Sequence, residues 1–308
     1  MGQSEMSTPR KKILVLGSGG MAGHVITLML RNDPRNFDVV DISRRDNEIK
    51  PVILMDMTGF ECLSAIIAEQ RPDIIINCIG LLNQYAEDHP DEAILVNSYL
   101  PHFLETLTAG TGTKVIQIST DCVFSGKKGG YAENDLKDGI GFYAQSKALG
   151  ELDNGKDLTI RTSIIGPELK SEGTGLLHWF SRQRGPIKGY QHAFWSGVTT
   201  VELAKFILAM VDNELHGICH LASPAKIAKF DLLGLFKKQF SSEIEIKPDS
   251  TYAVDKSLIS SRNDFNYTVP SYAEMIRDMA DWMDQHRALY PGYSHLVQHT
   301  GTAATTLH

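Results

Sequence analysis

The chain has 308 residues, of which 42% are apolar and 22% are charged. This composition excludes an intrinsically disordered chain and is sufficient for one large domain or, as we expect, two unequal lobes. The net charge is −7, from 30 basic and 37 acidic residues, so the sequence offers no basic field for nucleic acid or an anionic membrane.

Up to Thr162, short apolar runs alternate with helical patterns. The run at 11–16 ends at Gly17 and is typical of a strand buried on both faces of a parallel sheet. Apolar residues then recur at helical spacing over 20–30, before a polar stop at 32–34. Further buried-strand runs lie at 37–42, 73–78, 114–119 and 158–161. This alternation needs crossover connections and predicts an α/β fold with a doubly wound, Rossmann-like parallel sheet.

The regular alternation ends after Thr162, where Gly and Pro become frequent. A helical pattern at 201–211 and a strand pattern at 217–221 indicate that the chain then returns to the sheet. We therefore expect a dinucleotide-binding domain formed by 11–162 and 198–222, and a smaller, discontinuous substrate lobe formed by 163–197 and 223–286. The last helix is expected at 272–286, and a loose tail at 287–308.

The cysteines and the N-terminus bear on the compartment. Four cysteines lie far apart with no CxxC pair, which predicts reduced thiols rather than a disulfide framework: Cys62, Cys78, Cys122 and Cys219. Residues 1–12 lack the apolar stretch of a secretory signal. No apolar run approaches the roughly 20 residues that a membrane span requires. We expect a soluble, cytoplasmic protein.

A glycine-rich loop joins the first strand to the first helix. Its sequence GSGGMAG places Gly17, Gly20 and Gly23 in a GxxGxxG array. Such glycines let the backbone turn sharply and approach a pyrophosphate, which the positive end of the helix then stabilises. A purely structural turn is the alternative, but the position between a strand and a helix favours dinucleotide binding.

The residues after the second strand give two signals about the cofactor. Asp41 could hold a ribose 2′-hydroxyl, whereas Arg44 and Arg45 could hold a 2′-phosphate. Because the arginines lie just past the strand, the sequence favours NADPH, with NADH as the alternative. A solvated charged loop is the competing interpretation for either arginine.

Three further residues have the chemistry of a carbonyl reductase. Tyr143 and Lys147 are four apart in a helical stretch and so share a face. A neighbouring cation would lower the pKa of the phenol from about 10 toward a useful range for proton transfer. Thr120 follows a buried strand, at the edge where ligands bind in such sheets, and could hydrogen-bond the substrate oxygen. The alternatives are a chance surface pair and a threonine bonded to backbone.

Two other features are weighed against ordinary structural roles. His216 and His220 flank Cys219, but the strand pattern there does not place both imidazoles on one face, so no metal site is expected. Trp195 lies in an irregular segment and could stack on a base or sugar, with core packing as the alternative.

Several segments together carry a resemblance to a known family. They are GSGGMAG, RPDIIINC, the VN at 96–97, ISTDCVFSG, YAEND, YAQSK and LTIRTSIIG. Over about residues 12–285 the chain resembles the extended short-chain dehydrogenase/reductase superfamily and, within it, the dTDP-4-dehydrorhamnose reductase family. Cys122 departs from the family's usual Tyr, Ala144 from a common Gly, and 164–166 from an aromatic-bearing stretch. These departures lie near the sugar, so they bear on the substrate more than on the reaction.

The resemblance implies roles for individual residues. The implied catalytic residues are Thr120, Tyr143 and Lys147. The implied cofactor-binding residues are Gly17, Gly20 and Gly23 at the pyrophosphate, Asp56 and Met57 at the adenine, and Cys78, Ile79 and Gly80 on the nicotinamide side, with Asn97 near the active site. The predicted cofactor site also includes Met21 of the glycine loop, Arg44 and Arg45 after the second strand, and Tyr143 and Lys147. The implied substrate-binding residues are Thr120, Asp121, Cys122, Tyr143, Ser163 and Trp195.

The resemblance also implies an activity. It is the NAD(P)H-dependent reduction of a keto-deoxysugar nucleotide, in activated-sugar and surface polysaccharide biosynthesis. Tyr143 would donate the proton, Thr120 would position the carbonyl, and Lys147 would tune the phenol and hold the ribose. The partners are then a nucleotide-sugar substrate and, as an option, a second copy in a homodimer. Two alternatives stay open: an epimerase or dehydratase that keeps NAD bound, and a non-catalytic NADP-binding regulatory subunit.

Overall fold

The computed structural model describes residues 10–56 and 59–296, and its centre is a seven-stranded sheet in which every pair of neighbours is parallel. The spatial order is β10-β6-β5-β4-β1-β2-β3. The strands are β1 (Lys12–Leu16), β2 (Asp38–Ser43), β3 (Ile53–Leu54), β4 (Ile74–Asn77), β5 (Lys114–Thr120), β6 (Leu158–Thr162) and β10 (Gly217–His220). The predicted fold class is confirmed.

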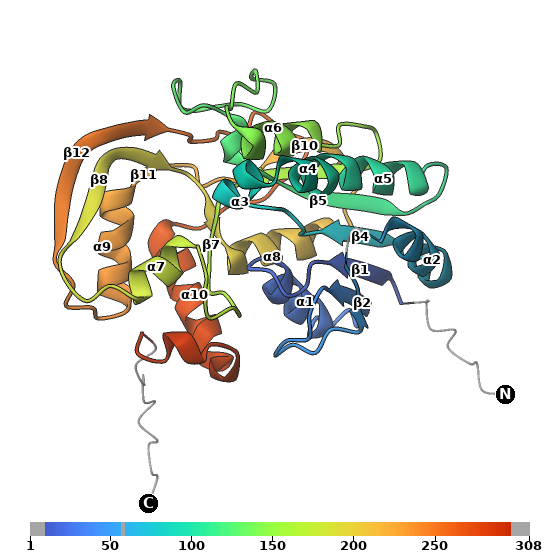
Figure 1. Ribbon diagram of the computed structural model, residues 1–308, viewed down its shortest axis with the longest axis horizontal. Coiled ribbons are helices and arrows are strands. Elements are labelled where there is room, and N and C mark those ends of the chain that lie inside the picture. Colours follow the sequence, from blue (N-terminus) through green and yellow to red (C-terminus); the bar gives the residue numbers. More distant parts are fainter. Residues whose placement is uncertain (1–9, 57–58, 297–308) are drawn as a thin grey trace, which may run out of the picture.

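Helices cover both faces of this sheet (Figure 1). The alternation of side chains along β1 explains why, since Ile13 and Val15 join one hydrophobic cluster and Leu14 and Leu16 join another. The first cluster includes α1 (Gly23–Arg31) and α8 (Thr200–Met210). The second includes α2 (Phe60–Gln70) and α5 (Leu100–Leu107). A strand that is apolar at every position therefore needs both helical layers.

The strand order reverses between β1 and β4. From β1 the chain builds outward through β2 and β3, and then returns to the other side of β1 to add β4, β5 and β6. The carboxyl ends of β1 and β4 consequently diverge into loops on opposite faces. Ligands of doubly wound sheets bind at such a switch point.

A second sheet lies at the far end of the molecule from β2 (Figure 1). It has the order β11-β8-β12, formed by β8 (Ile187–Trp195), β11 (Ile227–Ala228) and β12 (Ile246–Asp255). Helix α9 (Lys229–Gln239) covers it, with α7 (Leu176–Ser181) and α10 (Tyr272–Gln285) nearby. A short pair, β7 (Ile164–Ile165) and β9 (Val198–Thr199), lies between the two sheets along the chain.

The domain boundaries stay a prediction, because one hydrophobic cluster contains both Ile13 of β1 and Leu232 of α9. Of the predicted loose tail, residues 297–308 lie outside the described residues, and residues 287–296 are folded against the core. Two short 3₁₀ helices, Arg287–Leu289 and Pro291–Tyr293, follow α10 there. Tyr290 and Tyr293 are each 2% exposed, so their rings join the core and hold the backbone down. No helix among the described residues is long and apolar enough to cross a bilayer.

Candidate active site

The glycine loop lies at the switch point, directly after β1. Gly17 has a φ of +82°, and a Cβ there would lie 2.8 Å from Cγ1 of Ile79, so the loop packs against the segment that follows β4. A Cβ on Gly23 would overlap the carbonyl of Gly17, which makes the close turn into α1 dependent on glycine. Both positions therefore need glycine for backbone reasons.

The loop also has a polar atom that fits a phosphate group. Ser18 is fully buried, and its hydroxyl has no hydrogen-bond partner among the described residues. A buried hydroxyl usually finds a partner, so this one marks a place for a ligand oxygen. Together with the positive end of α1, the residues present fit a pyrophosphate.

The acidic and basic residues at the end of β2 lie in different environments. Asp41 is fully buried and forms an ion pair with Arg31 of α1, while its Oδ1 also accepts a bond of 3.3 Å from the Val52 amide. Its carboxylate is thus directed into the fold. Arg44 and Arg45 are exposed just past the strand. The exposed arginines fit a ribose 2′-phosphate, whereas Asp41 Oδ2, which is buried without a partner among the described residues, fits a 2′-hydroxyl.

The adenine-side residues are only partly described. Asp56 precedes α2, and its carbonyl accepts a bond of 3.1 Å from the Gly59 amide. Met57 lies outside the described residues, so the placement of this segment against an adenine stays a prediction.

The three predicted catalytic residues come from two adjacent elements. Thr120 ends β5 and caps the 3₁₀ turn Asp121–Val123, where its Oγ1 accepts a bond of 3.1 Å from the Cys122 amide. Tyr143 and Lys147 lie on helix α6 (Phe142–Leu149), which packs on β5 and on that turn. The Tyr143 phenol lies near the Thr120 hydroxyl, which itself donates to Asp121 Oδ1 at 3.2 Å. The structure therefore brings the hydroxyl and the phenol together.

The electrostatics of Tyr143 differ from the prediction. Burial raises the pKa of the phenol, and the nearby Cys122 thiol and Asp121 carboxyl act in the same direction. The expected lowering by Lys147 is wrong, because that ammonium faces elsewhere: its Nζ donates to the Ile118 carbonyl at 2.7 Å. The phenol is consequently neutral at physiological pH, which is the form that can donate a proton.

Lys147 belongs to a second group that lies next to the first. A Cβ on Gly80 would lie 3.7 Å from its Nζ and 3.5 Å from Oδ1 of Asn97, so three predicted cofactor residues converge. Burial lowers the pKa of Lys147 to about 8, although Glu151 and Cys78 oppose the shift. Burial likewise raises the pKa of the Cys78 thiol to about 12, so Cys78 stays neutral.

Asn97 fixes the segment after β4 against α6. It lies in the π-helical turn η1 (Ile94–Tyr99), an irregularity that is frequent at functional sites. Its Oδ1 accepts from the Leu81 amide at 2.8 Å, and its Nδ2 donates to the Leu81 carbonyl at 3.0 Å and to Ser146 Oγ at 3.1 Å. The amide thus connects the predicted nicotinamide side to the helix of Tyr143.

Glu87 is a residue whose role the sequence did not reveal. In the sequence it belongs to an acidic run around His89, a pattern that is typical of a solvated helix start. In the structure its carboxylate accepts from the backbone amides of Phe142 at 3.0 Å and Tyr143 at 3.2 Å. It caps α6, whose own N-cap, Gly141, has no side-chain oxygen. The absence of a capping side chain at the start of this helix was the signal in the sequence that a distant residue supplies the cap.

A buried ion pair supports the same edge of the sheet. Arg161 of β6 donates to both carboxylate oxygens of Glu151, at 2.7 and 2.8 Å, and Ser119 donates to the same carboxylate at 2.6 Å. Both charged side chains are at most 1% exposed. Burial alone would raise the pKa of Glu151, but the bonds from Arg161 hold it below its usual range. This pair joins β5, β6 and the end of α6.

The predicted substrate residues occupy two places. Asp121 and Cys122 adjoin Thr120, and burial raises the pKa of Asp121 while Lys256 opposes the shift. Ser163 follows β6, and its carbonyl accepts from the Val198 amide at 2.9 Å.

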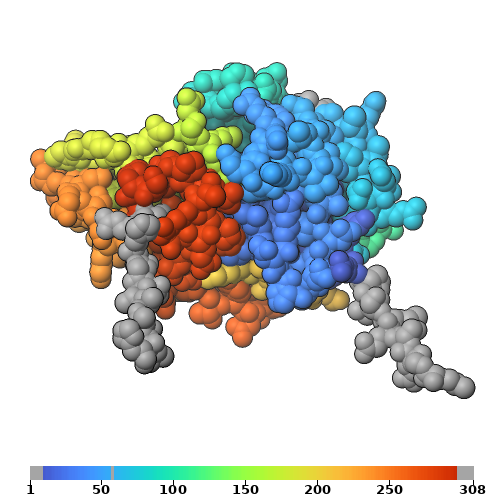
Figure 2. Space-filling view, turned by 90° about the horizontal axis from the view of Figure 1, so that it is seen from below, coloured from blue at the N-terminus to red at the C-terminus, as the bar shows by residue number. Residues whose placement is uncertain are grey.

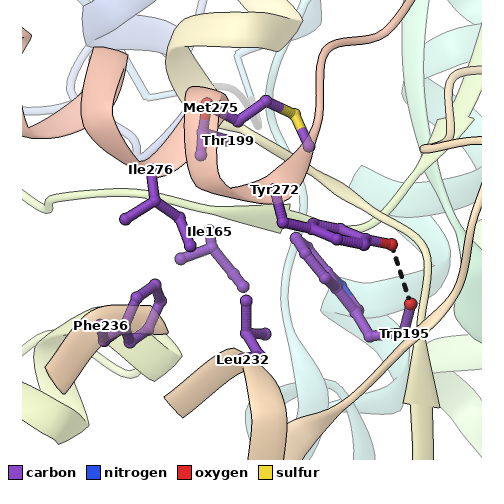
Figure 3. A pocket seen from close by; sticks show the side chains of 8 residues that line it. All are labelled: Ile165, Trp195, Thr199, Leu232, Phe236, Tyr272, Met275 and Ile276. Atoms are coloured by element: carbon purple, nitrogen blue, oxygen red, sulfur yellow. Dashed lines mark hydrogen bonds between the residues drawn. The ribbon is translucent and has the colours of Figure 1, made fainter. Parts of the chain in front are cut away.

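Trp195 packs in the interior instead of lying open in a cleft. It is 8% exposed, and its ring centroid lies 5.6 Å from that of Tyr272, whose hydroxyl donates to the Trp195 carbonyl at 3.1 Å. Figure 3 shows the small, mostly apolar pocket beside it, lined by Ile165, Trp195, Thr199, Leu232, Phe236, Tyr272, Met275 and Ile276. A substrate contact for Trp195 stays a prediction.

His220 takes a structural position, whereas His216 is exposed. His220 is buried at the end of β10, where its Nε2 lies 3.2 Å from Arg161 and its Nδ1 lies 2.9 Å from the Ile259 carbonyl. Within the described residues, no group of three His, Cys, Asp or Glu side chains could hold a metal ion.

The fold and these residues define a class of protein: a dinucleotide-binding α/β protein of the short-chain dehydrogenase/reductase type, with Thr, Tyr and Lys at the carboxyl edge of its sheet. Within that class, the chain belongs to the family described as RmlD substrate binding domain, whose model matches residues 11–263. The resemblance found in the sequence is confirmed.

Three known proteins illustrate the relationship. Methionine adenosyltransferase 2 subunit beta of Danio rerio is 26% identical over 246 residues, which are 75% of this chain and 74% of that protein. The dTDP-4-keto-6-deoxy-D-glucose reductase of Streptomyces niveus is 27% identical over 228 residues, 71% and 75% of the two chains. A crystal structure of dTDP-4-dehydrorhamnose reductase from Bacillus anthracis str. Ames with NADP matches with a TM-score of 0.75 at 22% identity, over 88% of this chain and 98% of that one. That likeness shows the fold.

Proposed function

We propose that this chain is an NADPH-dependent oxidoreductase that reduces the keto group of a nucleotide-linked deoxysugar. The observation that carries the proposal is the placement of a neutral phenol beside the Thr120 hydroxyl, on a helix whose Lys147 reaches the segment packed on the glycine loop. The named activity of the Streptomyces niveus relative supports the substrate class. Such reductases act in activated-sugar and surface polysaccharide biosynthesis, as the name of the Bacillus subtilis (strain 168) relative, spore coat polysaccharide biosynthesis protein SpsK, suggests.

The proposed cofactor site extends from the glycine loop to α6. Gly17, Gly20, Met21 and Gly23 would hold the pyrophosphate, Arg44 and Arg45 the ribose phosphate, Asp56 and Met57 the adenine, and Cys78, Ile79, Gly80 and Asn97 the nicotinamide side. The unpartnered Ser18 hydroxyl supports the pyrophosphate site, and the ion pair with Arg31 engages one of the two carboxylate oxygens of Asp41. The Bacillus anthracis structure contains NADP, and NADH is the alternative for this chain.

The proposed chemistry assigns one task to each side chain. Bound NADPH supplies the hydride that reduces the carbonyl carbon. Thr120 donates a hydrogen bond to the carbonyl oxygen and orients it, and Tyr143 gives that oxygen its phenolic proton, so that the alcohol forms. Solvent then reprotonates the phenol. Lys147 holds the nicotinamide ribose through its ammonium.

The proposed substrate site lies beyond Thr120, between the two predicted domains. Asp121, Cys122 and Ser163 would contact the sugar, with Trp195 as a stacking surface. The thiol at 122 replaces a larger phenol of related proteins and leaves more room there. We therefore place sugar specificity at this position and in the smaller lobe, residues 163–197 and 223–286.

One experiment tests the proposal directly. The purified chain is incubated with NADPH and a panel of 4-keto-6-deoxy nucleotide sugars, and the NADPH absorbance is followed. The proposal expects stoichiometric loss of absorbance with one of the sugars and loss of turnover of about a hundredfold or more in Tyr143→Phe, with unchanged thermal stability. Wild-type turnover in Tyr143→Phe would refute the assignment.

The same experiment separates the alternatives. Conversion of the sugar without net NADPH loss would identify an epimerase or dehydratase with bound NAD. The similarity to methionine adenosyltransferase 2 subunit beta favours a second candidate, a non-catalytic NADP-binding subunit. Binding of NADPH without turnover of any keto sugar, together with co-purification of a larger enzyme, would support that candidate.

We also propose a homodimer and a cytoplasmic location. Ile94 and Tyr99 of η1 and Leu149 of α6 are at least half exposed on neighbouring helices, which suits a contact between two copies. Sedimentation analysis tests the dimer. All four cysteines are free thiols, which suits a reducing compartment, and fractionation of cells tests the location.

A further inference from the structure

The segment after α10 turns back to the N-terminal half of the chain. Figure 2 shows this C-terminal part, in red, directly beside the blue N-terminal region. The contact is buried and polar: the Tyr290 hydroxyl lies 2.7 Å from Nε2 of His24, on the first turn of α1. Residues 287–296 lie outside the region matched by the family model, so they are an element of this chain that the family match does not explain.

The contact is part of a chain of hydrogen bonds that ends at the glycine loop. Nε1 of Trp282 donates to the Tyr290 hydroxyl at 2.9 Å, and Nδ1 of His24 lies 2.8 Å from the Gly20 carbonyl. An indole nitrogen can only donate and a carbonyl can only accept. The Tyr290 proton therefore goes to Nε2 of His24, and Nδ1–H donates to Gly20. Every donor and acceptor has one consistent direction.

The environment keeps the imidazole in this state. His24 is fully buried, Tyr290 is 2% exposed and Trp282 is 9% exposed. Burial lowers the pKa of His24 to about 4, and the bond to Gly20 opposes that shift only in part. The ring is therefore neutral at physiological pH, with its single proton on the nitrogen that faces Gly20. A change in tautomer would break two bonds at once.

The orientation of the Gly20 carbonyl determines the orientation of the Met21 N–H, because both belong to the same peptide group. It accepts a second bond of 3.2 Å from the His24 amide, so it points along α1 as a first-turn carbonyl. In a planar trans peptide the N–H points opposite to the C=O. Fixing the Gly20 carbonyl toward His24 therefore directs the Met21 N–H out of the helix N-terminus, toward the proposed pyrophosphate site.

We propose that Tyr290 is a positioning residue for the dinucleotide: through His24 it holds the Gly20 carbonyl, and so the C-terminal segment sets the orientation of the pyrophosphate-binding loop. This inference rests on the proposed function, since it concerns the NADPH site. It assigns to residues 287–296 a role in cofactor affinity, in addition to their role in packing.

The test removes one hydroxyl and keeps the ring. Tyr290→Phe leaves Nε2 of His24 buried without a donor, and the Kd of NADPH, measured by quenching of protein fluorescence, rises about fivefold to tenfold. The turnover at saturating NADPH stays within about twofold of wild type, since Tyr143 and Lys147 are untouched. A purely structural role would lower the thermal stability without this split between affinity and turnover.

A matched control and a coupled variant complete the test. Tyr267→Phe removes another partly buried hydroxyl, which donates to Glu202 at 2.6 Å away from the loop, and it leaves the Kd unchanged. In a protein that already carries His24→Gln, Tyr290→Phe raises the Kd of NADPH by less than about a further twofold, because both substitutions act through the same chain of hydrogen bonds. If Tyr290→Phe does not fold, Trp282→Phe is used instead. It removes the hydrogen bond from Trp282 to the Tyr290 hydroxyl and raises the Kd of NADPH about twofold.

Two results would overturn the inference. If the wild type binds NADPH and Tyr290→Phe or, in its place, Trp282→Phe binds it equally well, the positioning role is wrong while the proposed function stands. If the wild type does not bind NADPH, the proposed function and the positioning role both fail.

Discussion

The buried imidazole of His24 makes the stability of this protein depend on pH. Its contribution can be measured separately from the contributions of other titrating groups. Its pKa is about 4 in the folded chain, because burial disfavours the charged ring, against 6.5 for a free imidazole. Between these values the unfolded chain binds a proton that the folded chain does not. The free energy of unfolding contributed by this group therefore falls as the pH falls from about 6.5 to about 4, and is unaffected above that interval.

The size of the effect follows from the two pKa values. Each pH unit in the interval corresponds to about 1.4 kcal/mol, so one imidazole costs about 3 kcal/mol by the lower end of the range. Several carboxyl groups also titrate there, so the wild type is compared with His24→Gln, which keeps a polar side chain but cannot take up the proton. The free energy of unfolding is measured with urea at pH 4.5, 5.5, 6.5 and 7.5.

The comparison has a definite outcome. The wild type should lose stability relative to His24→Gln by about 2 to 3 kcal/mol between pH 7.5 and pH 4.5, with most of the change below pH 6.5. Parallel curves for the two proteins would show that His24 is not buried as a neutral ring, and the reasoning about Tyr290 and Gly20 would lose its basis.

Three other predictions concern the active site. The pKa of Lys147 is about 8, so its ammonium loses its charge as the pH rises above that value. The KM for NADPH should therefore increase from pH 7 to pH 9. A KM that does not change with pH would contradict the role of Lys147 at the ribose. Glu87→Ala removes the cap of α6 and should lower kcat about fivefold, from a loss of about 1 kcal/mol, whereas Glu87→Gln keeps an acceptor and should lower it less; equal effects would exclude capping. Arg161→Met leaves the buried Glu151 carboxylate with Lys137 as its cation partner, and should lower the free energy of unfolding in urea by about 3 kcal/mol at pH 7. Lys128→Met, whose partner Asp135 is more exposed, should lower it much less; similar losses would mean that Glu151 is solvated.

The raised pKa of Tyr143 keeps the phenol protonated and also makes it a weaker acid than a free phenol. A reductase needs a proton donor, and a neutral phenol beside Asp121 and Cys122 is a donor across the physiological range. The sequence had suggested that Lys147 would lower this pKa. Spacing along a helix shows only that two side chains share a face, and Lys147 uses that face to reach the Ile118 carbonyl. Its distance from the phenol depends on where α6 packs, which spacing does not contain.

The limits of prediction differ between the two sheets. The runs of β1 and β4 are apolar at successive positions, and only a strand covered on both faces has that pattern, so the central sheet was predictable. Strands β8 and β12 carry Gly189 and Pro248 and many exposed residues. Their apolar positions follow no clean alternation over the full length of either strand. Those strands were not recognisable locally.

The sequence by itself determined the parts of this protein that are local. These parts are short segments whose backbone conformation or spacing depends on neighbouring residues. They are the glycine loop, Thr120 at the end of a strand, and the helical pair Tyr143 and Lys147. Tertiary structure alone decided which distant groups complete them. Glu87 caps a helix that starts 55 positions later, Arg31 engages Asp41, and Tyr290 reaches His24 from the other end of the chain. These contacts depend on how whole elements pack, and packing is set by the sum of many apolar contacts rather than by any motif.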